Sequence, residues 1–187
     1  MLYSLQLSAC MTKINHPITL NKPQKTMTNQ AQQTADQKNA PQHHLLFDLC
    51  GVLVVEKSDG SFDLHEQGFA LLKQCYAQKN EHGARRHQFF VLSNISSRYP
   101  QLLAHYPELF ALFDGIFVPA TAPYKKPDPR SYEQVINTHA LDLRHCIMID
   151  DTPRNVQAAQ EVGMRGILFE NAEQVAEKLQ EWGILTT

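Results

Sequence analysis

Short apolar runs alternate with amphipathic segments along the chain from about residue 43 onward. Runs of four or five consecutive apolar residues, bounded by polar ones, are typical of strands that are buried on both faces. Between them, apolar residues spaced three and four apart predict helices. The predicted strands cover residues 45–49, 89–92, 115–118, 146–149 and 166–169. This alternation predicts right-handed βαβ units, and therefore a three-layer α/β domain with a doubly wound parallel sheet.

Polar residues ahead of the predicted helices supply start signals, either a capping side chain before a proline or a capping box. These signals are Asp128-Pro129, Thr152-Pro153, Asp63 with Glu66, and Asn171 with Gln174. Residues 51–60, between the first strand and the first helix, have the pattern of an irregular turn or a hairpin flap. The predicted domain thus runs from residue 43 to residue 187.

Residues 1–42 have a different composition, rich in Gln, Asn, Thr and Lys, with almost no apolar periodicity after Leu20. Such a segment buries too little apolar surface to offset the entropy lost on ordering, which predicts a disordered N-terminal tail. Met11 and Met27 lie inside it and are alternative translation starts, which mass spectrometry of the native N-terminus would distinguish.

The composition and net charge of the chain argue against some classes of binding partner. The chain has 187 residues, of which 43% are hydrophobic and 19% charged, and a formal net charge of -2. This charge predicts no binding to nucleic acid or to an anionic membrane, and no apolar run reaches the roughly 18 residues of a membrane span. The cysteines lack CxxC pairs and metal-ligand spacing, so we expect reduced thiols in a cytoplasmic protein. They are Cys10, Cys50, Cys75 and Cys146.

Polar residues follow three of the predicted strands: Asp48, Ser93-Asn94 and Asp150-Asp151. The carboxyl ends of parallel strands share one edge of a sheet, where ligands bind in open α/β folds. Clustered carboxylates repel one another unless a cation joins them, and an oxygen-only ligand set favours Mg²⁺. We expect Asp48 and Asp150 or Asp151 to hold the metal, together with a backbone carbonyl near residue 50.

A lysine before Asp128, either Lys125 or Lys126, would bring positive charge to the same edge. A carboxylate that attacks a phosphoryl group needs its own charge and the phosphate's charge compensated, and a metal, a lysine and a serine hydroxyl do this together. Each residue taken alone has a plainer interpretation: Asp48 as a turn residue, Lys126 as a solvated loop residue and Asp151 as an extra cap.

Four ordered segments of the chain resemble the motifs of the haloacid dehalogenase (HAD) superfamily, closest to its subfamily IA. They are residues 47–53 (FDLCGVL), 92–94 (LSN), 126–129 (KPDP) and 149–156 (IDDTPRNV). The resemblance spans residues 45–169 and implies a Rossmann-like fold, Mg²⁺ dependence and an aspartyl-phosphate on Asp48. It also implies that Ser93 and Lys126 bind phosphoryl oxygens and that Asp150 and Asp151 hold the metal. With the neighbouring amide of Asn94, Ser93 and Lys126 form the predicted substrate-binding set.

Cys50 departs from the family pattern, in which phosphatases usually carry a second Asp two residues after the nucleophile as acid and base. The Cys50 carbonyl is still available to the metal, but a thiol is a poorer proton-transfer group than a tuned carboxylate. We therefore expect a slow hydrolase of phosphate monoesters. Two alternatives are a dehalogenase, which has no use for the acidic pair Asp150-Asp151, and a catalytically silent module that binds a phosphorylated ligand.

The spacing of the motifs predicts at most a minimal cap over the site, because Asp48 and Ser93 are 45 positions apart and a flap and one helix use most of that interval. An open site accepts a phosphorylated macromolecule as well as a small molecule, or is closed by a second copy in a homo-oligomer. The sequence leaves these alternatives open.

Overall fold

A five-stranded parallel sheet forms the middle of the described chain. The computed structural model describes residues 43–186, so the tail predicted over residues 1–42 lies outside them. The sheet has the order β5-β4-β1-β6-β7. Its strands are β1 (His43–Phe47), β4 (His87–Leu92), β5 (Gly115–Phe117), β6 (Cys146–Asp150) and β7 (Arg165–Leu168).

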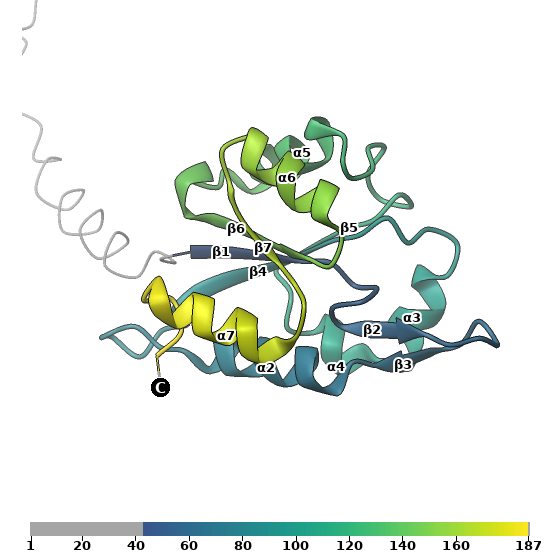
Figure 1. Ribbon diagram of the computed structural model, residues 1–187, viewed down its shortest axis with the longest axis horizontal. Coiled ribbons are helices and arrows are strands. Elements are labelled where there is room, and N and C mark those ends of the chain that lie inside the picture. Colours follow the sequence, from purple (N-terminus) through teal and green to yellow (C-terminus); the bar gives the residue numbers. More distant parts are fainter. Residues whose placement is uncertain (1–42, 187) are drawn as a thin grey trace, which may run out of the picture. The chain divides into compact units, whose positions relative to one another are not determined.

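Helices cover both faces of the sheet (Figure 1). They are α2 (Glu66–Ala77), α3 (Tyr99–His105), α4 (Pro107–Phe110), α5 (Pro129–His139), α6 (Pro153–Glu161) and α7 (Ala172–Glu181), with a 3-10 turn η1 (Leu143–His145). Residues of α5 and α6 pack on one face, and residues of α2, α3, α4 and α7 pack on the other. The predicted doubly wound, three-layer α/β architecture is confirmed.

The central strand β1 explains why its sequence is a continuous apolar run. It is hydrogen-bonded to β4 on one side and to β6 on the other. Leu45 and Phe47 contribute to the core cluster on one face and Leu46 to the cluster on the opposite face, all three fully buried. Burial of each such side chain contributes about 1.5–3 kcal/mol, which favours apolar residues at positions 45–47, the last three of the strand, directly before Asp48.

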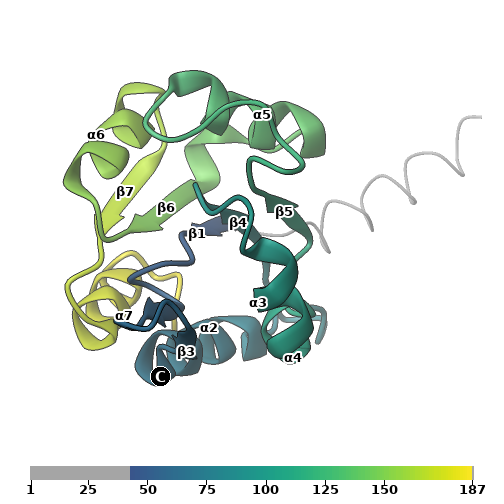
Figure 2. The same ribbon diagram turned by 90° about the vertical axis from the view of Figure 1, so that its right-hand side faces the viewer.

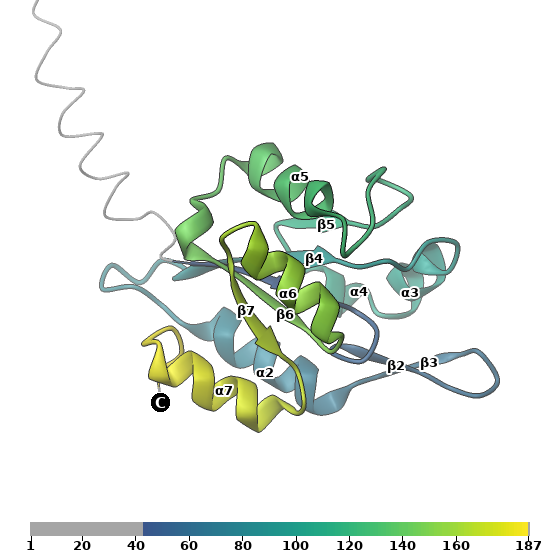
Figure 3. The same cartoon turned by 45° about the horizontal axis from the view of Figure 1, so that its top comes forward.

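A two-stranded hairpin of β2 (Val54–Glu56) and β3 (Phe62–Leu64) follows β1, as the predicted flap (Figure 3). It projects past the carboxyl edge of the sheet, onto which Figure 2 looks. The interval between β1 and β4 holds this hairpin and the helix α2.

The predicted helix starts are confirmed at two positions. The Asp128 side chain accepts from Arg130 N at 3.0 Å, and the Asn171 side chain accepts from Gln174 N at 2.9 Å. Helix α6 does begin at Pro153, but the Thr152 side chain makes no capping bond and its hydroxyl instead donates to Asp151 at 3.2 Å.

The capping box predicted at Asp63 is wrong. The residue that caps α2 is His65, whose Nδ1 accepts from Gly68 N at 3.0 Å. Asp63 lies in the middle of β3, where it pairs with Lys57 at 3.0 Å. Pairing of β3 with β2 keeps the backbone extended as far as Leu64, so the helix starts two residues later than the local pattern predicts.

None of the helices between residues 43 and 186 has the length and apolar character that crossing a bilayer requires.

Candidate active site

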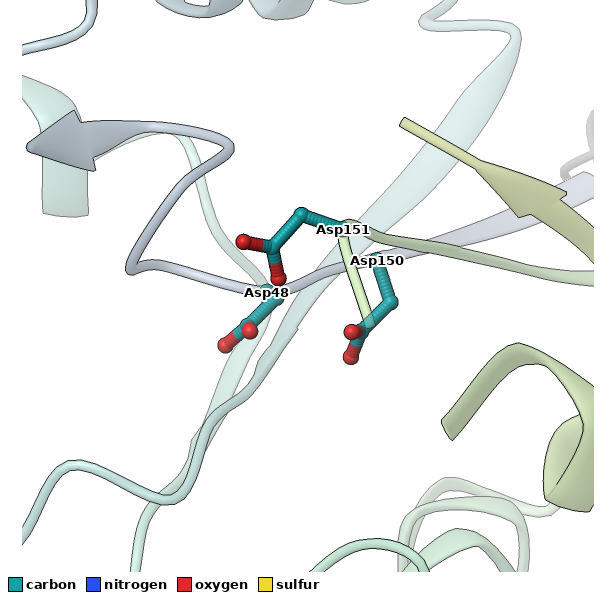
Figure 4. A group of neighbouring side chains, drawn as sticks. All are labelled: Asp48, Asp150 and Asp151. Carbon is teal, nitrogen blue, oxygen red and sulfur yellow. The ribbon is translucent and has the colours of Figure 1, made fainter. Parts of the chain in front are cut away.

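Three carboxylates meet at the carboxyl edge of the sheet (Figure 4). Asp48 directly follows β1, Asp150 ends β6, and Asp151 comes next. Each offers an oxygen within 4.8 Å of those of the other two. Asp48 and Asp150 are buried, whereas Asp151 is exposed. Parallel pairing of β1 with β6 brings these acids together, as the positions of the strand ends predict.

Lys126 lies between the two buried carboxylates. Its Nζ is 3.0 Å from Asp48 Oδ1 and 2.5 Å from Asp150 Oδ2, and its side chain is only 1% exposed. Lys125 is exposed. The structure thus selects Lys126 from the two candidates, and the plainer interpretation of Lys126 as a solvated loop residue is wrong.

Asp150 is held in one orientation by several donors. Asn155 Nδ2 donates to both of its carboxylate oxygens, at 3.0 and 3.1 Å, and Thr152 N donates to Oδ1 at 2.8 Å. Asn155 is itself fixed by the buried Tyr132, whose hydroxyl donates to the Asn155 carbonyl at 2.8 Å. Sequence reasoning assigned no role to Asn155, although its place in the first turn of α6, five residues after Asp150, would have identified it.

The environment of Asp48 works against its ionised form. Burial raises the pKa of its carboxyl, the negative charge of Asp150 adds to the rise, and Lys126 and a hydrogen bond with Ser93 oppose it. The backbone N–H of Leu49 also donates to Asp48 Oδ1, at 2.7 Å. Positive charge beyond that of Lys126 would therefore be needed to keep Asp48 ionised at this edge.

Ser93 and Asn94 both lie at the end of β4, but they have different partners. Ser93 is buried and bonds to Asp48. The Asn94 carboxamide donates to the Lys126 carbonyl at 2.8 Å and accepts from Lys126 N at 2.9 Å. The structure therefore gives Asn94 a positioning contact that fixes the backbone of Lys126, while substrate binding by Asn94 stays a prediction.

Gly51 makes room for Asp151. The glycine has φ of +84°, and a Cβ built on it would lie 2.0 Å from Asp151 Oδ2. A side chain at this position would therefore displace the carboxylate as well as strain the backbone.

Cys50 lies half-buried beside these groups. Burial, followed by the negative charges of Asp48 and Glu56, raises the pKa of its thiol to about 11. At neutral pH Cys50 is a protonated thiol and a weak proton donor, so this position, two residues after Asp48, lacks the acid–base chemistry of a carboxylate.

The donor set fits a divalent cation. Three carboxylates converge against a single buried ammonium group, so negative charge is in excess. All side-chain donors in the cluster are hard oxygens, the type that Mg²⁺ prefers. The residues that would hold the ion are Asp48, Asp150 and Asp151, while a contribution from the backbone carbonyl of Cys50 stays a prediction.

Comparisons with known proteins agree with this fold and site. A family model for haloacid dehalogenase-like hydrolases matches residues 80–163, which include Ser93, Lys126 and the Asp150-Asp151 pair. The chain is 40% identical over 77 residues to flavin mononucleotide hydrolase 1 of Arabidopsis thaliana, an alignment that covers 41% of this chain and 31% of that protein. It is 45% identical over 56 residues to a sesquiterpene phosphatase of Aspergillus oryzae, covering 30% of this chain and 29% of that protein.

Solved structures extend the likeness to the whole domain. A structure of an uncharacterized protein from Corynebacterium glutamicum matches with a TM-score of 0.58 at 20% identity, over 78% of this chain and 98% of that one. A HAD family enzyme from Bacteroides thetaiotaomicron, in complex with magnesium and inorganic phosphate, matches with a TM-score of 0.50 at 14% identity, over 71% of this chain and 98% of that one.

Residues 80–163 of the chain thus match the haloacid dehalogenase-like hydrolases, and the described domain shares the fold of the solved structures. The chain spans less than a third of the length of either curated relative.

Proposed function

We propose that this chain is a Mg²⁺-dependent phosphatase that hydrolyses a phosphate monoester through an aspartyl-phosphate on Asp48. The observation that carries the proposal is the buried Lys126, whose ammonium group joins Asp48 and Asp150 beside the exposed carboxylate of Asp151. The names of the two relatives, a flavin mononucleotide hydrolase and a sesquiterpene phosphatase, support a phosphate ester as substrate. The magnesium and phosphate bound by the Bacteroides enzyme support the cofactor.

In this mechanism a carboxylate oxygen of Asp48 attacks phosphorus, and the bond to the leaving oxygen breaks. The Ser93 hydroxyl and the Lys126 ammonium group bind phosphoryl oxygens and keep them in line with Asp48. Asp150, fixed by Asn155, keeps Lys126 in place. When bound by the three carboxylates, Mg²⁺ would supply the positive charge that offsets the phosphate. Water then attacks phosphorus, which releases phosphate and restores Asp48.

Turnover of para-nitrophenyl phosphate tests the reaction class. We expect hydrolysis that rises with added Mg²⁺ and stops with EDTA. Hydrolysis of a 2-haloacid without phosphatase turnover would instead identify a dehalogenase. Saturable binding of phosphate without any turnover would identify a binding module.

Replacing Cys50 with Asp is expected to raise kcat by about tenfold or more, because general acid–base catalysis contributes about 10²–10⁴ in rate. The pKa of the Cys50 thiol is raised to about 11, so the thiol stays protonated at neutral pH, whereas a carboxyl at this position would both give and take a proton. The measurement is turnover of aryl and alkyl phosphates in Mg²⁺, with the larger gain on the poorer alkyl leaving groups. Cys50→Asn, of the same size but unable to transfer the proton, is the matched control, and an equal gain in both variants would contradict the proposed role.

Replacing Gly51 with Ala is expected to weaken Mg²⁺ binding by about 10-fold or more, the scale reported for groups that orient metal ligands. The new methyl group would occupy the position of Asp151 Oδ2. Calorimetric titration with Mg²⁺ measures the effect. Gly83→Ala is the matched control, because Gly83 has φ of +77° and no atom within 4 Å of the added methyl group. Equal Mg²⁺ affinity in the two variants would show that Asp151 does not hold the ion.

A further inference from the structure

His65, directly before α2, is bonded to the nucleophile loop, residues 48–54. Its backbone N–H donates to the Leu53 carbonyl at 2.9 Å, and Leu53 N in turn donates to the Leu49 carbonyl at 2.8 Å. Leu49 N then donates to Asp48 Oδ1 at 2.7 Å. Three successive backbone donors therefore connect His65 to the carboxylate proposed as the nucleophile.

The side chain of His65 holds this backbone in place. Its Nδ1 accepts from Gly68 N at 3.0 Å, so the ring caps α2. The ring also lies edge-on to Phe169, with the two centroids 5.4 Å apart. Phe169 N donates to the Asp150 carbonyl at 2.9 Å. His65 thus lies between the nucleophile loop and the strand end that bears the predicted metal ligands.

Gly68 brings the first turn of α2 into contact with the same loop. A Cβ built on Gly68 would lie 1.9 Å from the Val52 carbonyl oxygen and 3.2 Å from His65 Nδ1. The helix therefore packs directly against the backbone of the nucleophile loop, at a distance that only glycine permits. Because packed interiors transmit strain, a shift of the helix start displaces the loop as well.

We propose that His65 is a positioning residue for the reaction, an inference that rests on the proposed phosphatase function. By capping α2 through Nδ1, it fixes the nucleophile loop, which carries both Asp48 and Gly51. In this role His65 touches neither the substrate nor the metal. It acts on the rate of the chemical step and on the affinity for Mg²⁺, whereas the phosphoryl oxygens are still bound by Ser93 and Lys126.

Steady-state turnover of para-nitrophenyl phosphate in saturating Mg²⁺ compares His65→Ala with the wild type. We expect kcat to fall by about 10- to 100-fold, the scale of losses when groups that orient a site are removed, while KM changes by less than about threefold. Calorimetric titration is expected to show Mg²⁺ affinity weakened by about 10-fold, which is a readout besides turnover. His65→Asn, whose carboxamide is a strong helix cap, is expected to restore both values to within about threefold of the wild type.

Asn171→Ala is the matched control, because it removes a cap of the same kind from α7, where the Asn171 side chain accepts from Gln174 N at 2.9 Å. Urea unfolding should show that both alanine variants are folded and lose similar stability, while only His65→Ala loses turnover and Mg²⁺ affinity. Equal kcat in the two alanine variants, or a His65→Asn enzyme as slow as His65→Ala, would overturn this inference and leave the phosphatase proposal intact.

A wild type with no Asp48-dependent turnover would overturn the phosphatase proposal instead. The calorimetric comparison would then still decide the role of His65, since Mg²⁺ affinity that is the same in His65→Ala and Asn171→Ala would show that His65 does not position the metal ligands.

Discussion

Replacing Asp48 with Asn is expected to abolish phosphatase turnover, with kcat lowered by about 10³-fold or more, the scale of losses when a nucleophile is removed. A carboxamide has the size of the carboxylate but does not attack phosphorus. Turnover of para-nitrophenyl phosphate in saturating Mg²⁺ measures the loss.

The same variant is expected to stay folded. Burial already disfavours the ionised Asp48, and Lys126 keeps its contact with Asp150 at 2.5 Å, so the free energy of unfolding should change by less than about 2 kcal/mol. Urea unfolding provides this control. If folded Asp48→Asn enzyme kept a tenth or more of wild-type turnover, the nucleophile would have to be another residue.

Replacing Lys126 with Met is expected to lower both activity and stability. Asp48 and Asp150 would be left side by side without their ammonium group, and removal of one partner from a buried ion pair costs about 3–5 kcal/mol. The stability loss should be largest in EDTA and smaller in Mg²⁺, because a bound cation would offset the same carboxylates. Urea unfolding under both conditions measures the difference, alongside turnover.

Lys125→Met is the control for this experiment, since the adjacent lysine is exposed and should tolerate the change within about 0.5 kcal/mol. Equal stability of the two variants in EDTA would mean that the Lys126 ammonium group does not compensate the buried acids.

The fold could be predicted from the sequence because buried strands and amphipathic helices leave local patterns of apolar and polar residues. The strands at Leu45, Phe89 and Ile147 are buried on both faces, which requires unbroken apolar runs. Asp48, Ser93 and Asp150 were found by the same logic, as each comes where such a run ends. The capping box at Asp63 failed because a pairing between distant residues, Val54 with Leu64, kept the chain extended there.

Other contacts in the site join residues that are distant in the sequence, so no local sequence pattern predicts them. Asn94 and Lys126 are 32 positions apart, and Lys126 and Asp150 are 24 apart. Neighbouring lysines at 125 and 126 look alike in sequence, yet only Lys126, paired with Asp48 and Asp150, is buried. Contacts of this kind depend on how the elements are packed, which residue spacing does not reveal.

The bonds between Asn94 and the backbone of Lys126 also have a consequence for protein engineering. Lys126 is fixed at both its N–H and its carbonyl by Asn94, and Asp128 caps the following helix, so the contacts that hold the Lys126 backbone include several outside the preceding loop. Residues 123–125 lie directly upstream and are exposed, and lengthening a surface loop carries only a small entropic penalty. This exposed stretch is therefore the place where a foreign segment could be grafted as an artificial lid, to give the protein a substrate preference of the designer's choosing.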